Sequence, residues 1–432
     1  MGYYEEAEKM QPELVKLRRD FHQYPETAWT EFRTTSIIAT VLKRLGFEVL
    51  LGKDILDEPS RMLVPDEKTL EACKKRALAE GADPKLVEKM DGGHTSCVGV
   101  MHFSRPGKTV GLRFDIDSLF VKESEDPDHR PTAEGFASRH PGLMHACGHD
   151  GHITIGLAVA RLVSLHKERM AGTLKIFFQP GEEGVVGAKA MVNSGLADDV
   201  DYFISGHIGL GGYEDQSLVI MAQGFLATDK IDAVFTGVPA HAGAEPEKGK
   251  NALLAAAQAA LALHTIPRHS SGASRINVGV MESGTGRNVV PENAVLKFET
   301  RGETAEINNF VAENAWRMVE GAAEMYGVDV KMIPVGSATT VLSSEAMGKE
   351  IYQVLEPLHQ YKKLVLEKKI SGSEDCCYFL SRVQERGGQA VYMLYGTQEA
   401  AGHHQSRFDF NEAVLSRSAA TVATLVEHFS NK

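Results

Sequence analysis

The strongest constraint on the fold is a series of metal-binding residue types, most of them placed just after short apolar segments. Residues 145–152 read His-Ala-Cys-Gly-His-Asp-Gly-His, and three further polar sets follow at 179–184, 205–207 and 402–404. An open α/β sheet brings such residues together at the carboxyl edge of its strands. The chain is therefore predicted to be an α/β protein with a metal site at that edge.

Three short stretches are predicted to be the buried strands that carry these residues. They span 109–116, 174–178 and 201–205. The polar residues at or just beyond their ends are Asp115, Asp117, Glu182, Glu183 and His207. Because ligands of such sheets bind outside the carboxyl ends of the strands, we expect these side chains to converge.

Cys147 and His149 form the densest part of the predicted site. A buried cysteine and a core histidine would be the ordinary interpretation of either residue alone. Here the polar residues are crowded, and Gly148 and Gly151 permit the tight backbone that lets several ligands converge. Thiolate and imidazole suit zinc, and imidazole with carboxylate also suits manganese or cobalt. Both residues are therefore predicted to bind metal.

The adjacent carboxylates Glu182 and Glu183 are predicted to have different tasks. Such a pair on a helix face would be exposed to solvent, but this pair follows a strand and is flanked by glycines. Near a metal, one carboxylate can bind the cation while the other takes a proton from water. His207 and one of the pair His403 and His404 are further candidate ligands. The other histidine of that pair would support the site or lie on the surface.

The middle of the chain is predicted to be a separate domain. From residue 224 the pattern changes to half-exposed strands, an alanine-rich helix and a long helix at 307–326. This block lies between ligand sets, so we interpret 224–335 as an insertion into a metal-binding domain made of 1–223 and 336–432. The length of 432 residues also favours two domains.

The N-terminal part is predicted to be mainly helical. Residues 12–23 have helical spacing with Pro12 near the start, and 30–45 fit a second helix before a strand at 47–51. Residues 54–95 are polar and helix-prone, and they are interpreted as an inserted helical excursion.

Composition and charge exclude several classes of function. The chain is 43% apolar and 24% charged, as soluble globular enzymes are. Its net charge is −12 and no run of Lys and Arg forms a phosphate-binding stripe, so no nucleic-acid partner is expected. No apolar run approaches the ~18 residues of a membrane span, and no signal peptide is evident. Five cysteines without a CxxC pair favour the reducing cytoplasm.

Other catalytic motifs do not fit. Residues 243–250 resemble a P-loop but have one residue too many, and Asn251 stands where Ser or Thr is required. Neither GxSxG nor HExxH occurs. His241, Arg287 and Asn288 lie in the predicted insertion, and the residues alone leave two interpretations open. They are turn residues, or they belong to a lid that stabilises an oxyanion and captures a carboxylate.

The ordered motifs resemble the M20 metallopeptidase family, in its amidohydrolase (aminoacylase/hippurate hydrolase) branch, over essentially the whole chain. The segments that carry the resemblance are 18–22, 25–26, 113–117, 144–152, 179–184, 207, 240–242, 288–291 and 372–375. Within that branch the chain looks most similar to the A-type subunits of p-aminobenzoyl-glutamate hydrolases. The resemblance implies a zinc-peptidase-like catalytic domain with a mixed sheet. It also implies that an inserted α+β, ferredoxin-like domain interrupts the catalytic domain and serves as a lid or dimerisation domain.

The resemblance also implies two divalent metal ions per subunit, manganese or zinc. The ligands that it implies are Cys147, His149, Glu183, His207 and His404. His404 is preferred to His403 because Phe408-Asp409 follows it at the distance typical of the family.

The remaining roles follow from the same resemblance. Glu182 becomes the general base, and His241 becomes the lid histidine that stabilises the oxyanion. Asp115 or Asp117 would orient a metal-bound histidine. The residues expected to contact the substrate are Asn288, Arg287 and Gly372. Arg287 is unusually charged for its place in the motif, and we hypothesise that it holds a second carboxylate of the substrate.

The activity implied by the resemblance is metal-dependent hydrolysis of N-acyl amino acids. The expected substrate is p-aminobenzoyl-glutamate, cleaved to p-aminobenzoate and glutamate. One alternative is a general N-acyl-amino-acid or hippurate amidohydrolase, and another is a non-catalytic partner subunit. The expected assembly is a homodimer or a hetero-oligomer with a paralogous subunit.

Overall fold

The chain folds into two compact units. The computed structural model describes residues 2–210 and 214–432. The first unit contains the residues up to 223 together with 342–370 and 376–432, and the second contains 224–341 and 371–375. The sequence placed the end of the insertion at residue 335, which lies inside strand β10 (Asp329–Ala338). The second unit therefore continues past that boundary until the strand is complete.

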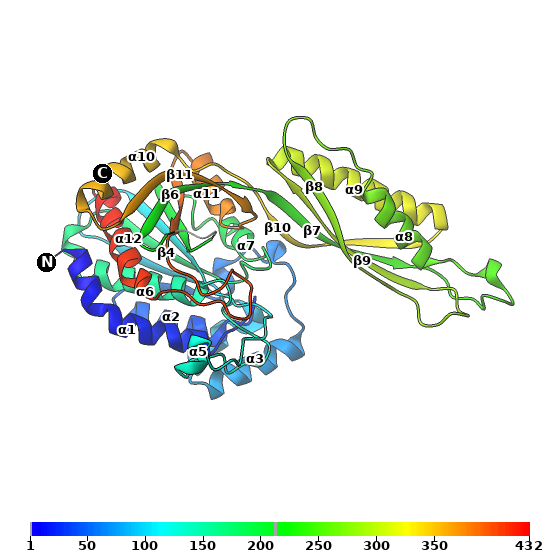
Figure 1. Ribbon diagram of the computed structural model, residues 1–432, viewed down its shortest axis with the longest axis horizontal. Helices are drawn as coiled ribbons and strands as arrows, with labels where there is room; N and C mark the ends of the chain where they lie inside the picture. Colours follow the sequence, from blue (N-terminus) through cyan, green and yellow to red (C-terminus); the bar gives the residue numbers. More distant parts are fainter. Residues whose placement is uncertain (1, 211–213) are drawn as a thin grey trace. The chain divides into compact units, whose positions relative to one another are not determined.

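The first unit is built on an eight-stranded mixed sheet with the order β1-β2-β4-β3-β5-β12-β6-β11 (Figure 1). Its strands are β1 (Glu48–Leu51), β2 (Cys97–His102), β3 (Thr109–Asp115), β4 (Thr173–Gln179), β5 (Tyr202–Ile208), β6 (Ser217–Phe225), β11 (Lys363–Gly372) and β12 (Gln389–Tyr395). The central strands β4, β3, β5 and β12 are parallel, whereas β1, β2 and β6 pair antiparallel to their neighbours. The predicted α/β class with a mixed sheet is confirmed.

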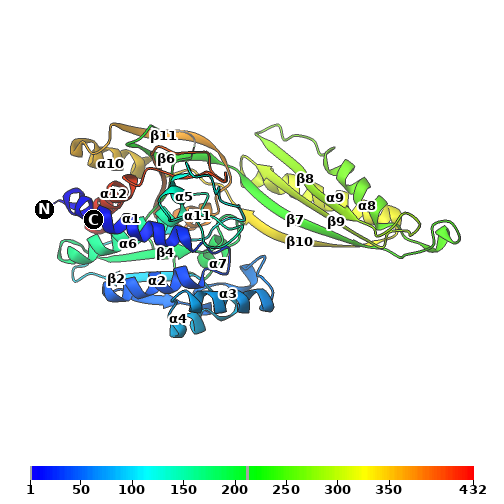
Figure 2. The same cartoon turned by 60° about the horizontal axis from the view of Figure 1, so that its bottom comes forward.

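Helices cover both faces of this sheet (Figures 1 and 2). The helices of the first unit are α1 (Tyr3–Gln23), α2 (Phe32–Arg44), α3 (Glu67–Ala79), α4 (Pro84–Lys89), α5 (Arg130–Ala133), α6 (His149–Leu165), α7 (Ala188–Asn193), α10 (Glu345–Leu355), α11 (Cys377–Glu385) and α12 (Val414–Ser430). Helices α1, α6 and α12 pack together, with α6 and α12 against β3 and β4, while α11 packs on β5 and β12.

Two adjacent phenylalanines in β4 show which helices share a face. The ring of Phe178 lies 5.9 Å from that of Phe114, and both border Gly156 of α6. The ring of Phe177 instead lies 5.1 Å from that of Phe379 of α11. Because successive side chains of a strand point to opposite faces, α6 and α11 lie on opposite sides of the sheet.

The first helix is longer than the sequence predicted. It begins at Tyr3 rather than near Pro12, so the proline lies inside the helix. The buried positions of its first half are Tyr3, Ala7, Met10 and Leu14. Their spacing places them on one face, and burying that face in the core offsets the hydrogen bond that the proline cannot make.

Residues 54–95 form the helical excursion that the sequence indicated. Helices α3 and α4 pack against α2, and a small apolar cluster lies between them. The buried members of that cluster are Phe32, Leu70, Ala77, Ala82, Val87 and Met90. The excursion therefore has a small core of its own next to the N-terminal segment.

The second unit has the order βαββαβ. Its elements are β7 (Ala227–Thr236), α8 (Ala252–Leu263), β8 (Ser274–Ser283), β9 (Asn293–Gly302), α9 (Ala305–Tyr326) and β10. The strands form an antiparallel sheet in the order β10-β7-β9-β8, with α8 and α9 packed on it. This is the ferredoxin-like arrangement expected for the insertion. The backbone carbonyl of Gly372 accepts the N–H of Leu226 at 2.7 Å, which ties 371–375 to this unit.

Within the described residues, no helix is long and apolar enough to cross a membrane. The five cysteines are all free thiols.

The close contact of Gly156 with the Phe114 and Phe178 rings gives a test of the core. A Cβ at residue 156 would lie 2.7 and 2.8 Å from atoms of these packed rings. We expect Gly156→Ala to lower the free energy of unfolding by about 1–3 kcal/mol, measured by urea denaturation. The matched control is Gly321→Ala in α9, where a Cβ has no neighbour within 4 Å and helix propensity favours alanine. Equal effects of the two substitutions would contradict the packing argument.

Candidate metal centre

Potential metal ligands meet at the carboxyl edge of the parallel strands. Strand β3 ends at Asp115, β4 ends at Gln179 before the two glutamates, and β5 contains His207. Among the groups of potential ligands whose donor atoms lie within 4.8 Å of one another are Cys147, His149 and His207; Cys147, Glu183 and His404; and His149, Glu182 and Glu183. The structure thus brings together the five residues that the family resemblance implied as ligands, with Glu182 beside them.

A left-handed glycine lets Cys147 and His149 face the same point. Gly148 has a φ of 88° and directly precedes α6, which begins at His149. This conformation is accessible to glycine at little cost. It brings Cys147 Sγ to 3.5 Å from Nε2 of His207.

Hydrogen bonds to backbone carbonyls fix which ring nitrogen of each histidine faces the site. His207 Nδ1–H donates to the carbonyl of Ile208 at 2.7 Å, and His149 Nδ1–H donates to the carbonyl of Asp117 at 2.9 Å. The Nε2 atoms are therefore turned inward. Burial, and then the neighbouring rings of His152 and His403, lower the pKa of His207 well below its usual range. His207 is thus neutral, as a metal-binding imidazole must be.

Asp117 holds the turn that carries the two glutamates. Its Oδ1 accepts the N–H of Glu182 at 3.0 Å, and its Oδ2 accepts the N–H of Glu183 at 3.1 Å. Nε2 of His149 lies 3.8 Å from Oε2 of Glu182 and 3.7 Å from Oε1 of Glu183, too far for hydrogen bonds. Nε2 of His149 therefore faces both carboxylates without a hydrogen bond to either of them.

Asp115 has a different partner from Asp117. Its Oδ1 accepts Nδ1–H of His152 at 2.5 Å, and its Oδ2 accepts from Arg113 at 2.7 Å. His152 Nε2 accepts the N–H of Ile208 at 2.9 Å, so both ring nitrogens of this histidine are engaged. His152 thus joins the ends of β3 and β5. No role for His152 was predicted from the sequence, although this residue lies one helical turn after His149.

His403 and His404 both lie near the site but contact different residues. His404 has a left-handed φ of 64°, and its Nε2 is 3.3 Å from Oε2 of Glu183. His403 lies with Nδ1 3.4 Å from Cys147 Sγ and Nε2 3.0 Å from Oε1 of Glu399. His404 therefore contacts the carboxylate of Glu183, whereas His403 contacts the sulfur of Cys147.

The donor set fits a divalent cation. Burial, and then the charge of Glu183, raise the pKa of the Cys147 thiol well above its usual range. A buried thiol beside carboxylates needs a positive charge to become a thiolate. Sulfur, imidazole and carboxylate donors together suit zinc or manganese.

The candidate residues of the second unit lie at its surface. His241 Nδ1 accepts the N–H groups of Gly243 and Ala244 at 3.2 and 3.1 Å, so Nε2 carries the proton of the neutral ring. The backbone carbonyl of Asn288 accepts the N–H of Ala242 at 3.0 Å, which joins the two loops. His241, Arg287 and Asn288 are all exposed.

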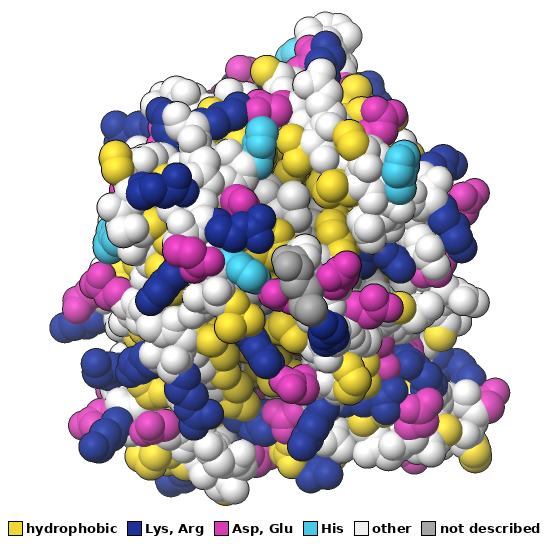
Figure 3. Space-filling model, turned by 90° about the vertical axis from the view of Figure 1, so that its left-hand side faces the viewer, with side chains coloured by type: hydrophobic (Ala, Val, Ile, Leu, Met, Phe, Trp, Pro, Cys, Tyr) yellow, Lys and Arg dark blue, Asp and Glu magenta, His cyan; other side chains and the backbone are white. Residues whose placement is uncertain are grey.

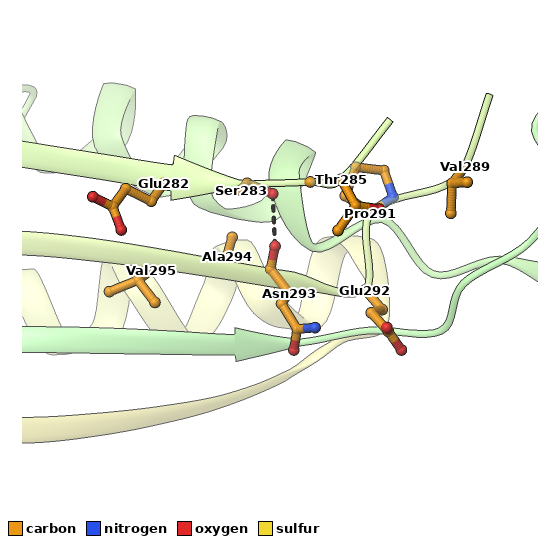
Figure 4. A pocket seen from close by; sticks show the side chains of 10 residues that line it. Glu282, Ser283, Thr285, Val289, Pro291, Glu292, Asn293, Ala294 and Val295 are labelled. Atoms are coloured by element: carbon orange, nitrogen blue, oxygen red, sulfur yellow. Dashed lines mark hydrogen bonds between the residues drawn. The ribbon is translucent and has the colours of Figure 1, made fainter. Parts of the chain in front are cut away.

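A pocket of about 240 Å³ lies at the ends of β8 and β9, next to these loops (Figure 4). Its lining includes Ser283, Val289 and Pro291 and two charged residues, Glu282 and Glu292. No basic side chain lines it, so this pocket does not suit an anionic substrate.

Acidic and basic side chains are interspersed on the face of the molecule shown in Figure 3. The face carries no broad patch of Lys and Arg. The mixture of both signs on this face is in keeping with the net charge of −12.

The sequence matches known proteins over nearly its whole length. Peptidase family M20/M25/M40 matches residues 111–428. The indole-3-acetyl-aspartic acid hydrolase of Enterobacter agglomerans is 47% identical over 419 residues, covering 97% of this chain and 96% of that protein. The A-type subunit of the p-aminobenzoyl-glutamate hydrolase of Escherichia coli K12 is 45% identical over 425 residues, with the same two coverages.

Solved structures agree with the fold. The aminobenzoyl-glutamate utilization protein of Klebsiella pneumoniae has a TM-score of 0.85 and 39% identity, and the match covers 99% of this chain and 98% of that one. A dinuclear metal-binding peptidase of the M20 family from Bacillus subtilis has a TM-score of 0.66 and 21% identity, with coverages of 98% and 99%.

The position of Cys147 leads to a test of metal binding. We expect Cys147→Ala to lower the content of tightly bound divalent cation by at least one equivalent per protein chain, measured by elemental analysis after dialysis. The reason is that a buried sulfur donor is removed from the site. The matched control is Cys97→Ala, because Cys97 is also a buried free thiol but lies in β2, outside the donor groups. Equal cation content in the two variants would exclude Cys147 as a ligand.

Proposed function

The chain belongs to peptidase family M20/M25/M40, and we propose that this metallo-amidohydrolase cleaves the amide bond between an aromatic acid and an acidic amino acid. Two relatives of nearly equal similarity, at 47% and 45% identity, support this substrate class. One is named for indole-3-acetyl-aspartic acid and the other for p-aminobenzoyl-glutamate. Both compounds combine an aromatic acyl group with an amino acid that has two carboxylates. p-Aminobenzoyl-glutamate is our first candidate.

The observation that carries the proposal is the placement of Glu182. The residue is 8% exposed, its backbone N–H is held by Asp117, and its carboxylate lies beside His149 and Glu183 without being bonded to His149. A carboxylate next to a metal site can exchange protons with water and with a leaving amine. Glu182 is therefore assigned as the general base.

The proposed metal ligands are Cys147, His149, Glu183, His207 and His404. A pair of divalent cations bound there would lower the pKa of water and polarise the carbonyl of the substrate. The support for a pair is that the M20-family peptidase from Bacillus subtilis, which shares this fold, is named as a dinuclear metal-binding peptidase.

The reaction then depends on proton transfers at Glu182. Its carboxylate takes a proton from the attacking water as the water oxygen bonds to the amide carbon. When the carbon–nitrogen bond breaks, Glu182 gives this proton to the departing amine. We assign oxyanion stabilisation to the exposed Nε2–H of His241 and contact with the substrate carboxylate to Asn288 and Gly372.

Arg287 is proposed to select substrates with a second carboxylate. Its guanidinium is exposed and can form paired hydrogen bonds with a carboxylate. A hippurate or N-acetyl amino acid lacks the second carboxylate. A general N-acyl-amino-acid amidohydrolase remains the alternative in which Arg287 has no such role.

For assembly we propose a homodimer or a hetero-oligomer with a paralogous subunit. The support is that one relative is named as one of the subunits of its hydrolase. A non-catalytic role for this chain within such an assembly is the alternative, and the presence of Glu182 together with all the proposed ligands favours catalysis.

Substitution of the proposed base tests the mechanism. We expect Glu182→Gln to lower kcat by about 10²–10⁴-fold, since the amide cannot accept the proton from water. Cation content should stay as in the wild type. The matched control is Glu168→Gln, whose carboxylate is 69% exposed outside the site and whose loss should leave kcat unchanged. Activity of Glu182→Gln near that of the control would remove Glu182 from the role of base.

A comparison of substrates tests the acyl and amino-acid groups. We expect the metal-restored protein to hydrolyse p-aminobenzoyl-glutamate and indole-3-acetyl-aspartate with higher kcat/KM than hippurate or N-acetyl-methionine. Arg287→Ala should lower kcat/KM by about tenfold or more for the dicarboxylates only, because a charge-assisted contact is lost. Equal losses on all four substrates would exclude Arg287 as the selecting residue, and preference for hippurate would favour the general amidohydrolase.

A further inference from the structure

We propose that Glu31 is a positioning residue of the metal centre, held in place by the helical excursion at 54–95. Glu31 is fully buried in the first unit. Its Oε1 accepts the backbone N–H of Gly181 at 3.1 Å, and its Oε2 accepts the hydroxyl of Thr95 at 2.6 Å. Nothing in the sequence pattern of the metal site points to this residue, which lies 150 positions before Gly181.

Glu31 and Asp117 together hold three successive backbone amides. Glu31 binds the N–H of residue 181, while Asp117 binds those of Glu182 and Glu183. Each peptide plane of the turn is thereby fixed by a buried carboxylate. Loss of the first contact frees the peptide plane between Pro180 and Gly181, at the start of the turn, and allows both glutamate side chains to move.

The backbone of the turn at 181–183 is also restricted by its own conformation and packing. Gly181 has a left-handed φ of 65°, and a Cβ there would lie 2.7 Å from the side chain of Val186. The two carboxylates therefore depend on the local backbone for their direction. Metal-binding and catalytic groups need placement within about 0.5 Å, so a modest shift weakens both functions.

The excursion at 54–95 holds the two chain segments that position the Glu31 side chain. Arg61 donates to the carbonyls of Gly92 at 2.7 Å and Gly93 at 3.1 Å, just before Thr95. Its guanidinium also lies 4.6 Å from the centre of the Trp29 ring, two residues before Glu31. The indole N–H of Trp29 donates to the carbonyl of Met62 at 2.8 Å. Residues 61–62 thus connect the Glu31 segment with the Thr95 segment.

Glutamine is the conservative substitution at this position. Burial, and then the nearby Asp117 carboxylate, raise the pKa of Glu31 well above its usual range. A neutral amide of the same shape is therefore tolerated. Its oxygen can accept from Gly181, while its NH₂ group can donate to the Thr95 hydroxyl.

Glu26 offers a matched control. It is also fully buried, and its carboxylate accepts two backbone N–H groups, those of Arg33 at 3.0 Å and Thr34 at 2.8 Å. These amides belong to the start of α2 rather than to the turn at 181–183. Removing Glu26 therefore reports the general cost of losing a buried carboxylate that holds the backbone.

The test compares Co²⁺ binding by Glu31→Ala, Glu31→Gln and Glu26→Ala. The titration is monitored by calorimetry and by the visible absorption of the bound ion. We expect Glu31→Ala to weaken Co²⁺ binding by about 10–100-fold and to lower kcat more than it changes KM. Glu31→Gln should stay within about threefold of the wild type. Glu26→Ala should lower the melting temperature but bind Co²⁺ as the wild type does.

The proposal is overturned if Glu31→Ala binds Co²⁺ like the wild type, or if Glu26→Ala loses as much affinity as Glu31→Ala. If Glu31→Ala does not fold, Thr95→Val decides, because it removes only the hydroxyl contact and should weaken Co²⁺ binding several-fold. Unchanged binding in a folded Thr95→Val then counts against the proposal. The kcat readout rests on the proposed function, whereas Co²⁺ binding does not. A wild type that binds Co²⁺ but cleaves no substrate would contradict the proposed function and leave the test of Glu31 intact.

Discussion

The arrangement of the site depends on the two-sided role of Asp117. Its carboxylate binds the amides of Glu182 and Glu183, and its backbone carbonyl accepts from Nδ1 of His149. This single residue, two positions after the end of β3, thereby fixes both the turn after β4 and the first residue of α6. Because a strand end, a turn and a helix start all meet at this residue, small errors in any one of them would separate the donor atoms. Together, the buried carboxylates of Asp117 and Glu31 fix the backbone conformation of the turn at 181–183.

A second set of buried charged side chains holds the segments next to the metal centre together. Arg18 of α1 lies 2.9 Å from Asp150 and 3.0 Å from Asp409, and His22 lies 2.7 Å from Asp150. These contacts join α1 to the first turn of α6 and to the segment that follows His404. Buried ion pairs add little net stability, yet they strongly disfavour arrangements that would leave one partner unpaired. Their effect here is to restrict the site to one geometry.

Much of the fold and of the candidate site could be predicted from local patterns. Strands β3, β4 and β5 were expected near their observed bounds because short apolar runs are followed by polar residues. The insertion was recognisable as a separate block of strands and helices because its periodicity differs from that of the flanking chain, whereas its α+β, ferredoxin-like class was implied by the family resemblance. Strands β2, β6, β10 and β11 and the first two turns of α1 were not predicted. Their residues become strand or helix through pairing and core burial, and these tertiary contacts override weak local preference.

The sequence by itself determined the kinds of donor atom, their order along the chain and their position at strand ends. Those features follow from residue chemistry and from periodicity, so the α/β class and a metal centre could be inferred directly. Only the tertiary structure decided which ring nitrogen of His149 faces the site, that Asp115 holds His152, and that Glu31 binds Gly181. These are contacts between residues far apart in the chain or between side chains and distant backbone. No local pattern encodes them, because they arise only when the strands, turns and helices pack together.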